Sequence, residues 1–182
     1  MEATFGQVEF TNGAGALTNR IRLADGPLDL AWQHCGVTSE FLGDFFALQL
    51  GKTGGNYNEA RHSIGYLTNE LLENALKFRH GADIALEASL DGSCFELRIS
   101  NQITTETAGK FQALLAELTT RDPGELLIER IEENAENMNS SGSGLGLLTL
   151  MSDYGARLGW RFQPAAEADA MRLETYAALD IV

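Results

Sequence analysis

The amino-acid sequence predicts an α+β fold, a two-layer α/β sandwich in which helices cover one face of an antiparallel or mixed sheet. Three observations predict it. Two long segments place apolar residues at helical spacing, a later segment alternates apolar and polar residues on both sides of a tight turn, and a glycine-rich loop opens directly into an apolar helix. The 182 residues fit a single domain over residues 1–182.

An N-terminal strand and helix are expected to extend the fold over residues 1–57. The stretch Gly26–Trp32 alternates after a turn and predicts a short strand, and Thr38 is the expected N-cap of the helix that follows. The apolar residues on one broad face of this helix are Val37, Phe41, Leu42, Phe45, Phe46, Leu48 and Leu50.

The expected core of the fold covers residues 58–177 and begins with a longer helix from about Asn58 to Phe78. Strands over Ile84–Leu90 and Phe95–Ile99 form a hairpin around the turn Asp91-Gly92. The remaining expected elements are two helices within 105–137 separated at 122–124, a polar loop over 137–144, a helix over Leu145–Tyr154, and a strand pair over Arg157–Phe162 and Met171–Ala177.

The charge balance restricts the partners of this protein. Thirteen Lys and Arg residues stand against 26 Asp and Glu, a net charge of −13. Such a field repels nucleic-acid backbones and anionic lipid headgroups wherever basic residues are not clustered, and no such cluster is expected, so neither nucleic acid nor a membrane is an expected partner. An anionic ligand must instead be held locally by backbone amides, a helix N-terminus or a metal ion.

Cysteine spacing and hydropathy indicate the compartment. Cys35 and Cys94 form no CxxC pair, so neither a disulfide framework nor a zinc site is predicted, and both are expected to be small buried groups. The sequence shows no basic and apolar leader and no window of about 18 consecutive apolar residues. The expected location is cytoplasmic.

Glu70 and Asn74 are the first candidate functional pair. They stand at i and i+4 in the predicted long helix and therefore share one face. An amide oxygen can coordinate Mg²⁺ while the neighbouring carboxylate accepts a proton from an attacking hydroxyl. The alternative interpretation is a solvated face of an amphipathic helix.

The second candidate is the glycine-rich segment Ser141–Leu147, which runs directly into an apolar helix. Its glycines allow close approach of the backbone to a ligand, and the free amides of a helix N-terminus favour a phosphate chain. A glycine hinge or linker would look similar.

Together these blocks resemble the GHKL ATPase/kinase superfamily. Glu70–Lys77 (ELLENALK) is similar to its N-box and Gly142–Leu147 (GSGLGL) to its second glycine box. The resemblance implies the histidine-kinase-like ATPase fold with ATP and Mg²⁺ as cofactors, Asn74 as the metal ligand and Glu70 as the base. It further implies Lys77 as a phosphate neighbour and a phosphate loop made of Gly142, Ser143, Gly144, Leu145 and Gly146.

One element departs from the pattern of this superfamily. The first glycine box, usually Asp-x-Gly-x-Gly, aligns with Asn101-Gln102-Ile103-Thr104-Thr105. The side-chain oxygen of Asn101 can still accept a hydrogen bond from the adenine amino group, but the charge and both glycines are missing. A nucleotide-free scaffold therefore stays open as an alternative.

A stand-alone domain of this length resembles the anti-sigma-factor serine kinases of bacterial partner-switching modules. Leu30-Ala31-Trp32 and the helix before the core are most similar to the SiaB-like regulator branch. The resemblance implies transfer of the ATP γ-phosphoryl group to a small anti-sigma-antagonist-type protein. The alternatives are a non-catalytic module that regulates by docking and an ATP-hydrolysing enzyme, and a homodimer stays open.

Other conspicuous residues are expected to be structural. Trp32 and Trp160 are predicted core residues, and the histidines, His34, His62 and His80, are predicted to be structural or on the surface. The acidic run Glu125–Glu136 is either a solvated helix face or a surface for a basic partner.

Overall fold

The computed structural model describes residues 2–9, 16–24, 31–52, 54–81, 83–136 and 144–181. Its strands are β1 (Ala3–Gly6), β2 (Leu17–Leu23), β3 (Ile84–Asp91), β4 (Cys94–Thr104), β5 (Arg157–Pro164) and β6 (Ala170–Asp180). Its helices are α1 (Trp32–Lys52), α2 (Tyr57–Phe78), α3 (Thr105–Leu118), α4 (Pro123–Glu136) and α5 (Leu145–Ser152).

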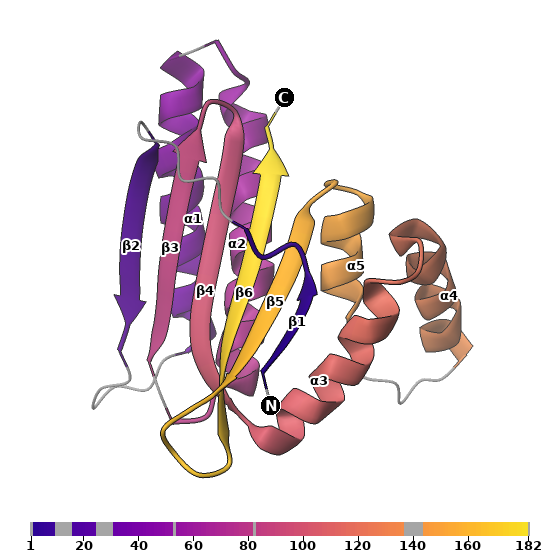
Figure 1. Cartoon of the computed structure of the whole chain (residues 1–182). Helices are drawn as coiled ribbons and strands as arrows, with labels where there is room; N and C mark the ends of the chain where they lie inside the picture. Colours follow the sequence, from indigo (N-terminus) through magenta and orange to yellow (C-terminus); the bar gives the residue numbers. More distant parts are fainter. Residues whose placement is uncertain are drawn as a thin grey trace.

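All the described strands belong to one antiparallel sheet with the order β1-β5-β6-β4-β3-β2. Helices α1 and α2 lie behind this sheet in Figure 1, with α5 beside them, and α3 leads from β4 to α4 at the side. The predicted two-layer α+β architecture is confirmed. Among the described residues no helix is both long enough and apolar enough to cross a membrane.

Hairpin β3–β4 lies where alternation predicted it. Residues Leu86 and Ile99 pair across it and are both buried under the helices, while their neighbours Glu87 and Arg98 pair on the opposite face. Gly92 has φ 59° in the turn, a conformation that glycine adopts without strain.

Helix α1 begins earlier than predicted: Trp32 was assigned to the end of a strand, and the helix was expected to start only at Thr38. Trp32 is the first helical residue, and residues 26–30 of the predicted strand lie outside the described residues. The N–H of Ala31 donates to Nδ1 of His34, which resembles a capping box. Thr38 lies inside the helix, and its hydroxyl donates to the carbonyl of His34, so the N-cap prediction was wrong.

The apolar residues of α1 divide between two faces instead of sharing one. Leu42 and Phe46 are fully buried, whereas Val37 and Phe41 are exposed. The prediction that Trp32 is a core residue was also wrong, because its side chain is 55% exposed, whereas Trp160 is 1% exposed as predicted.

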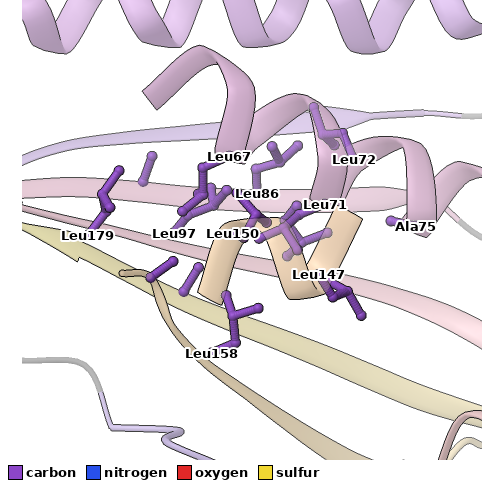
Figure 2. Packing of buried hydrophobic residues seen from close by; sticks show 14 of the residues in the cluster. Leu67, Leu71, Leu72, Ala75, Leu86, Leu97, Leu147, Leu150, Leu158 and Leu179 are labelled. Carbon is purple, nitrogen blue, oxygen red and sulfur yellow. The ribbon is translucent and has the colours of Figure 1, made fainter. Parts of the chain in front are cut away.

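Helix α2 packs closely against α1. Its N-cap is Asn56, whose side chain accepts hydrogen bonds from two amides of the first turn. A Cβ on Gly43 of α1 would lie only 2.7 Å from the carbonyl oxygen of Arg61, so this crossing requires glycine. The opposite face of α2 supplies leucines to the core, where they meet leucines of α5 and the sheet (Figure 2).

The strands β1 and β2 were not predicted. Strand β2 pairs with β3 from Leu17↔Leu90 to Leu23↔Ile84, and β1 pairs with β5 from Ala3↔Phe162 to Gly6↔Gly159. Each occupies one edge of the sheet. Short edge strands with polar residues on the outward face carry a weak alternation signal.

Candidate functional site

The candidate site lies where α2, the start of α5 and β4 meet. One face of α2 presents the row His62, Tyr66, Glu70 and Asn74, each four residues after the last. Glu70 and Asn74 are half-buried, beside a core stripe that includes Leu71. The predicted shared face of Glu70 and Asn74 is therefore present.

Glu70 reaches the first turn of α5. A Cβ placed on Gly146 would lie 2.0 Å from Oε2 of Glu70 and 3.0 Å from its Cδ. The helix starts after Gly144, which has no side chain to cap the free amides. Because the positive end of the helix dipole lies there, a carboxylate is favourable at this position. The structure thus brings Glu70 and Gly146 together from segments that are far apart in the sequence.

Burial raises the pKa of Glu70 above its usual value, and the charge of Glu73 raises it further. A hydrogen bond from the Tyr66 hydroxyl lowers this pKa and partly offsets both effects. Tyr66 is in turn hydrogen-bonded to the Thr149 side chain on α5. A polar chain from Thr149 through Tyr66 to Glu70 therefore joins the two helices.

An aromatic cluster supports this polar chain. The rings of Tyr66 and Tyr154 stack with centroids 4.9 Å apart, and Nε2 of His62 lies 3.2 Å from the Tyr154 hydroxyl. His62 thus has a structural role, as predicted. Sequence reasoning missed Tyr66 and Thr149, although the four-residue spacing from Tyr66 to Glu70 was a usable signal for the tyrosine.

The structure describes two glycines of the predicted phosphate loop, Gly144 and Gly146, and at each position the local structure favours glycine over other residues. Gly144 has φ 93°, which an L side chain rarely adopts, and Gly146 makes room for Glu70. Leu145 is half-buried at the start of α5, and Gly142 and Ser143 lie outside the described residues. The glycine pattern is therefore explained in part by the fold alone.

Asn101 is buried on β4, on the face that packs against α2, and is 3% exposed. Its Nδ2 lies 3.4 Å from the carbonyl oxygen of Ala75, the residue after Asn74. Its Oδ1 is buried with no hydrogen-bond partner. An unsatisfied buried acceptor costs about 1–3 kcal/mol, and a donor that reached this oxygen would remove that cost.

The contact that the structure gives for the Lys77 side chain is with Phe78 and not with another residue of the predicted site. Lys77 is exposed in the last turn of α2, and its Nζ lies 5.1 Å from the ring centroid of Phe78. Its predicted contact with a phosphate would need a different side-chain conformation.

The candidate residues fit a nucleotide at one end better than at the other. At the base end, Asn101 Oδ1 is a free acceptor for an amino group. At the phosphate end, the Glu70 carboxylate already lies against α5. Among the described residues, no three His, Cys, Asp or Glu side chains are grouped to hold a metal, so a Mg²⁺ ion here would depend on Asn74 and on ligand phosphates.

The acidic run of α4 is partly neutralised within the chain. Glu129 pairs with Arg121, and Glu133 pairs with Arg130, which also bonds Glu117 of α3. Such exposed pairs contribute little stability, but they leave fewer free carboxylates for a basic partner.

Comparison with known proteins identifies a shared fold. No protein-family model and no curated protein matches the chain. Among solved structures, a chain from "The crystal structure of SiaB-SiaC complex from Pseudomonas aeruginosa" aligns with a TM-score of 0.62 and 14% sequence identity, over 90% of this chain and 89% of that chain. At this identity the likeness concerns the fold alone, and it supports a SiaB-like fold for this protein.

Proposed function

We propose that this protein is an ATP-binding regulator of the partner-switching kind, a serine/threonine protein kinase that phosphorylates a small anti-sigma-antagonist-type protein. The observation that carries the proposal is the buried, unpartnered Oδ1 of Asn101 beside the helix that presents Glu70 and Asn74. An acceptor without a partner costs free energy when it is buried, and a hydrogen bond from a ligand would remove that cost.

The base end of the proposed site is formed by Asn101. Its Oδ1 accepts a hydrogen bond from the adenine amino group, while Nδ2 keeps its contact with the Ala75 carbonyl. The amide is neutral, so this contact is weaker than the one that a carboxylate would make.

The phosphate end is formed by Asn74 and the N-terminus of α5. When bound, Mg²⁺ supplies charge neutralisation on the phosphates, and Asn74 is its only proposed protein ligand. Gly142, Ser143, Gly144, Leu145 and Gly146 provide backbone amides to the phosphate chain, and Lys77 becomes a phosphate neighbour.

Glu70 is the proposed base. The pKa of its carboxyl group is raised toward neutral pH, which favours proton acceptance from a substrate hydroxyl. To act, it has to leave its place against Gly146, and the Tyr66 hydroxyl is positioned to guide it.

The proposed partner is a small regulatory protein. The solved structure with the shared fold is a complex of SiaB with SiaC, which supports a protein partner for this chain as well. A cytoplasmic location and a homodimer are compatible with this role and are part of the proposal.

Calorimetry with Mg-ATP on the purified protein tests the function. We expect binding in the wild type, loss of binding in Asn74→Ala, and retained binding without phosphoryl transfer in Glu70→Gln. Binding at 100 times Kd also stabilises the protein by about 2.7 kcal/mol, which a thermal scan detects. No heat and no thermal shift at millimolar Mg-ATP reject the ATP site.

A docking module without nucleotide is the second candidate. The contact between Glu70 and Gly146 favours it, since this carboxylate occupies the helix end that phosphates would need. Partner binding that is identical with and without Mg-ATP, in Asn74→Ala as in wild type, is the result expected for this candidate.

A further inference from the structure

The outer face of the sheet gathers basic residues that are scattered in the sequence. Strand register places Arg20 and Arg22 of β2 and Arg98 of β4 on the face opposite the helices. Arg157, Arg161 and Arg172 of β5 and β6 join them there, so this face carries six of the 13 basic residues. The expectation that basic residues do not cluster was therefore wrong in three dimensions, because alternate positions of neighbouring strands share a face.

Two small residues create a depression among these arginines. In register across the strands, Arg22 lies opposite Ala85, and Ala85 lies opposite Ser100. The longer side chains of Arg20, Arg98 and Arg172 stand around this small pair, and the resulting open depression has a volume of about 430 Å³. This face is turned toward the viewer in Figure 1. The volume is in the usual range of small-molecule sites.

The carboxylates that pair with these arginines lie beneath the guanidinium groups. The Arg20 and Arg98 side chains are 77% and 42% exposed, whereas Glu87, which pairs with both, is 15% exposed. Arg172 is 54% exposed, and its partner Glu174 is 8% exposed. Arg22 is 75% exposed, and its partner Asp83 is 26% exposed. Glu87 also lines the depression, but the guanidinium groups make up most of its exposed charged surface, and the ion pairs compensate the more buried carboxylates.

The same carboxylates hold the guanidinium groups in place. Glu87 accepts hydrogen bonds from Nε and Nη2 of Arg20 and from Arg98, and Nε of Arg172 donates to the Ser100 hydroxyl. Each guanidinium has five N–H donors, so donors remain for a ligand. Arginines oriented in this way lose little freedom when they bind an anion.

We propose that this depression binds a small phosphate-bearing molecule, with the phosphate oxygens between Arg20, Arg22, Arg98 and Arg172 and the ligand resting on Ala85 and Ser100. Arginine suits phosphate because its planar donors bind two oxygens at once. A small ligand also experiences less repulsion from the net charge of −13 than an extended polyanion does. The proposal is independent of the proposed ATP site, which lies on the helix-covered side of the sheet.

Titration calorimetry with inorganic pyrophosphate, without magnesium, tests the proposal on the full chain. The informative variants are the double variant Arg20→Gln/Arg22→Gln, in which both side chains are highly exposed, and Ala85→Tyr, which fills the floor of the depression. We expect each to weaken binding about tenfold or more, the double variant because it loses charge-assisted hydrogen bonds and Ala85→Tyr because its ring occupies the place of the ligand. A thermal scan of each variant verifies that it is folded.

Two variants serve as controls. Arg157→Gln removes one positive charge from the same face outside the depression, and Lys77→Gln removes the exposed basic side chain proposed beside the phosphates of the separate candidate site. We expect both to bind pyrophosphate like the wild type. The proposal is overturned if the wild type does not bind at millimolar pyrophosphate, if Arg157→Gln weakens binding by as much per charge removed as the double variant, or if Lys77→Gln abolishes binding. Binding of polyglutamate but not pyrophosphate would identify an acidic protein surface as the occupant and also overturn it.

Discussion

Glu70 and Gly146 touch so closely that the second residue has no room for a side chain while the first stays in place. A methyl group on Gly146 would come within 2.0 Å of Glu70 Oε2. Glycine in a helix interior costs about 1 kcal/mol relative to alanine, and Gly146, in the first turn of α5, carries part of this cost. The contact joins the two sequence blocks from which the function is proposed.

A double-mutant cycle measures this contact. In a Glu70→Ala background, Gly146→Ala is expected to stabilise the protein by up to about 1 kcal/mol, the full value applying to a helix interior and Gly146 lying in the first turn of α5. In the wild-type background the same change displaces the carboxylate and its bond to Tyr66, so the gain disappears or reverses. Urea denaturation of the four proteins gives the coupling energy, expected at about 0.5–3 kcal/mol. A coupling near zero would show that Glu70 moves aside freely.

The raised pKa of Glu70 predicts how stability depends on pH. Burial makes ionisation of Glu70 unfavourable in the folded state, so the folded protein binds the proton of this carboxyl group more tightly than the unfolded chain does. The stabilisation that results from this proton is fully present below the unfolded pKa of 4.5 and is lost as pH rises through the folded value. Glu70→Gln cannot ionise. We therefore expect it to match the wild type below pH 4.5 and to have a higher urea midpoint at neutral pH. Glu132→Gln, at an exposed position of α4, removes one carboxylate from another part of the chain and is the control for the loss of a negative charge.

Asn101→Leu separates stability from ligand binding. The variant removes an unsatisfied buried acceptor, at the cost of two long hydrogen bonds of 3.4 and 3.5 Å. We expect the free energy of unfolding to rise by about 1 kcal/mol, while the thermal shift caused by Mg-ATP is lost. A marked loss of stability would mean that the bond to the Ala75 carbonyl, not the free oxygen, explains the asparagine.

Cys94 is only partly buried, so the prediction that both cysteines are buried was wrong for this residue, but its thiol is still expected to be a poor nucleophile in the native protein. Burial, followed by the hydrogen bond and charge of Asp180, raises its pKa to about 11 from an ordinary 9.0, which lowers the thiolate fraction roughly 100-fold at neutral pH. Cys35 is 1% exposed and its pKa is also raised by burial. Mass spectrometry after iodoacetamide treatment should find both labelled only after denaturation. Rapid native labelling of Cys94 would contradict its placement.

Periodicity predicted the helices and the central hairpin because their apolar residues face one shared core. It failed at Trp32, where alternating residues were interpreted as a strand although Cys35 continues the buried face of the helix. It also missed β1 and β2, whose pairing partners lie far along the chain. Short edge strands depend on tertiary pairing, which local patterns do not contain.

The candidate site was partly predictable for a similar reason. Spacing along one helix was sufficient to place Glu70 beside Asn74, and it also extends to Tyr66. Spacing cannot reveal that Glu70 lies against Gly146, or that Asn101 has an unsatisfied oxygen, because both depend on how separate elements pack. The arginines of the outer face became neighbours only through strand register.

The order of the strands also has a consequence for synthesis. Strand β1 is made before any other described element, whereas its partner β5 begins only at Arg157. Ala3 can therefore pair with Phe162 only after the ribosome has made the chain as far as β5. Throughout most of translation β1 has no β5 to pair with, while β2 can already join the β3–β4 hairpin. Contacts between such distant segments form slowly and leave unpaired strands exposed to aggregation. The described sheet is therefore complete only after β6, which pairs with β5 on one side and β4 on the other, has also been made.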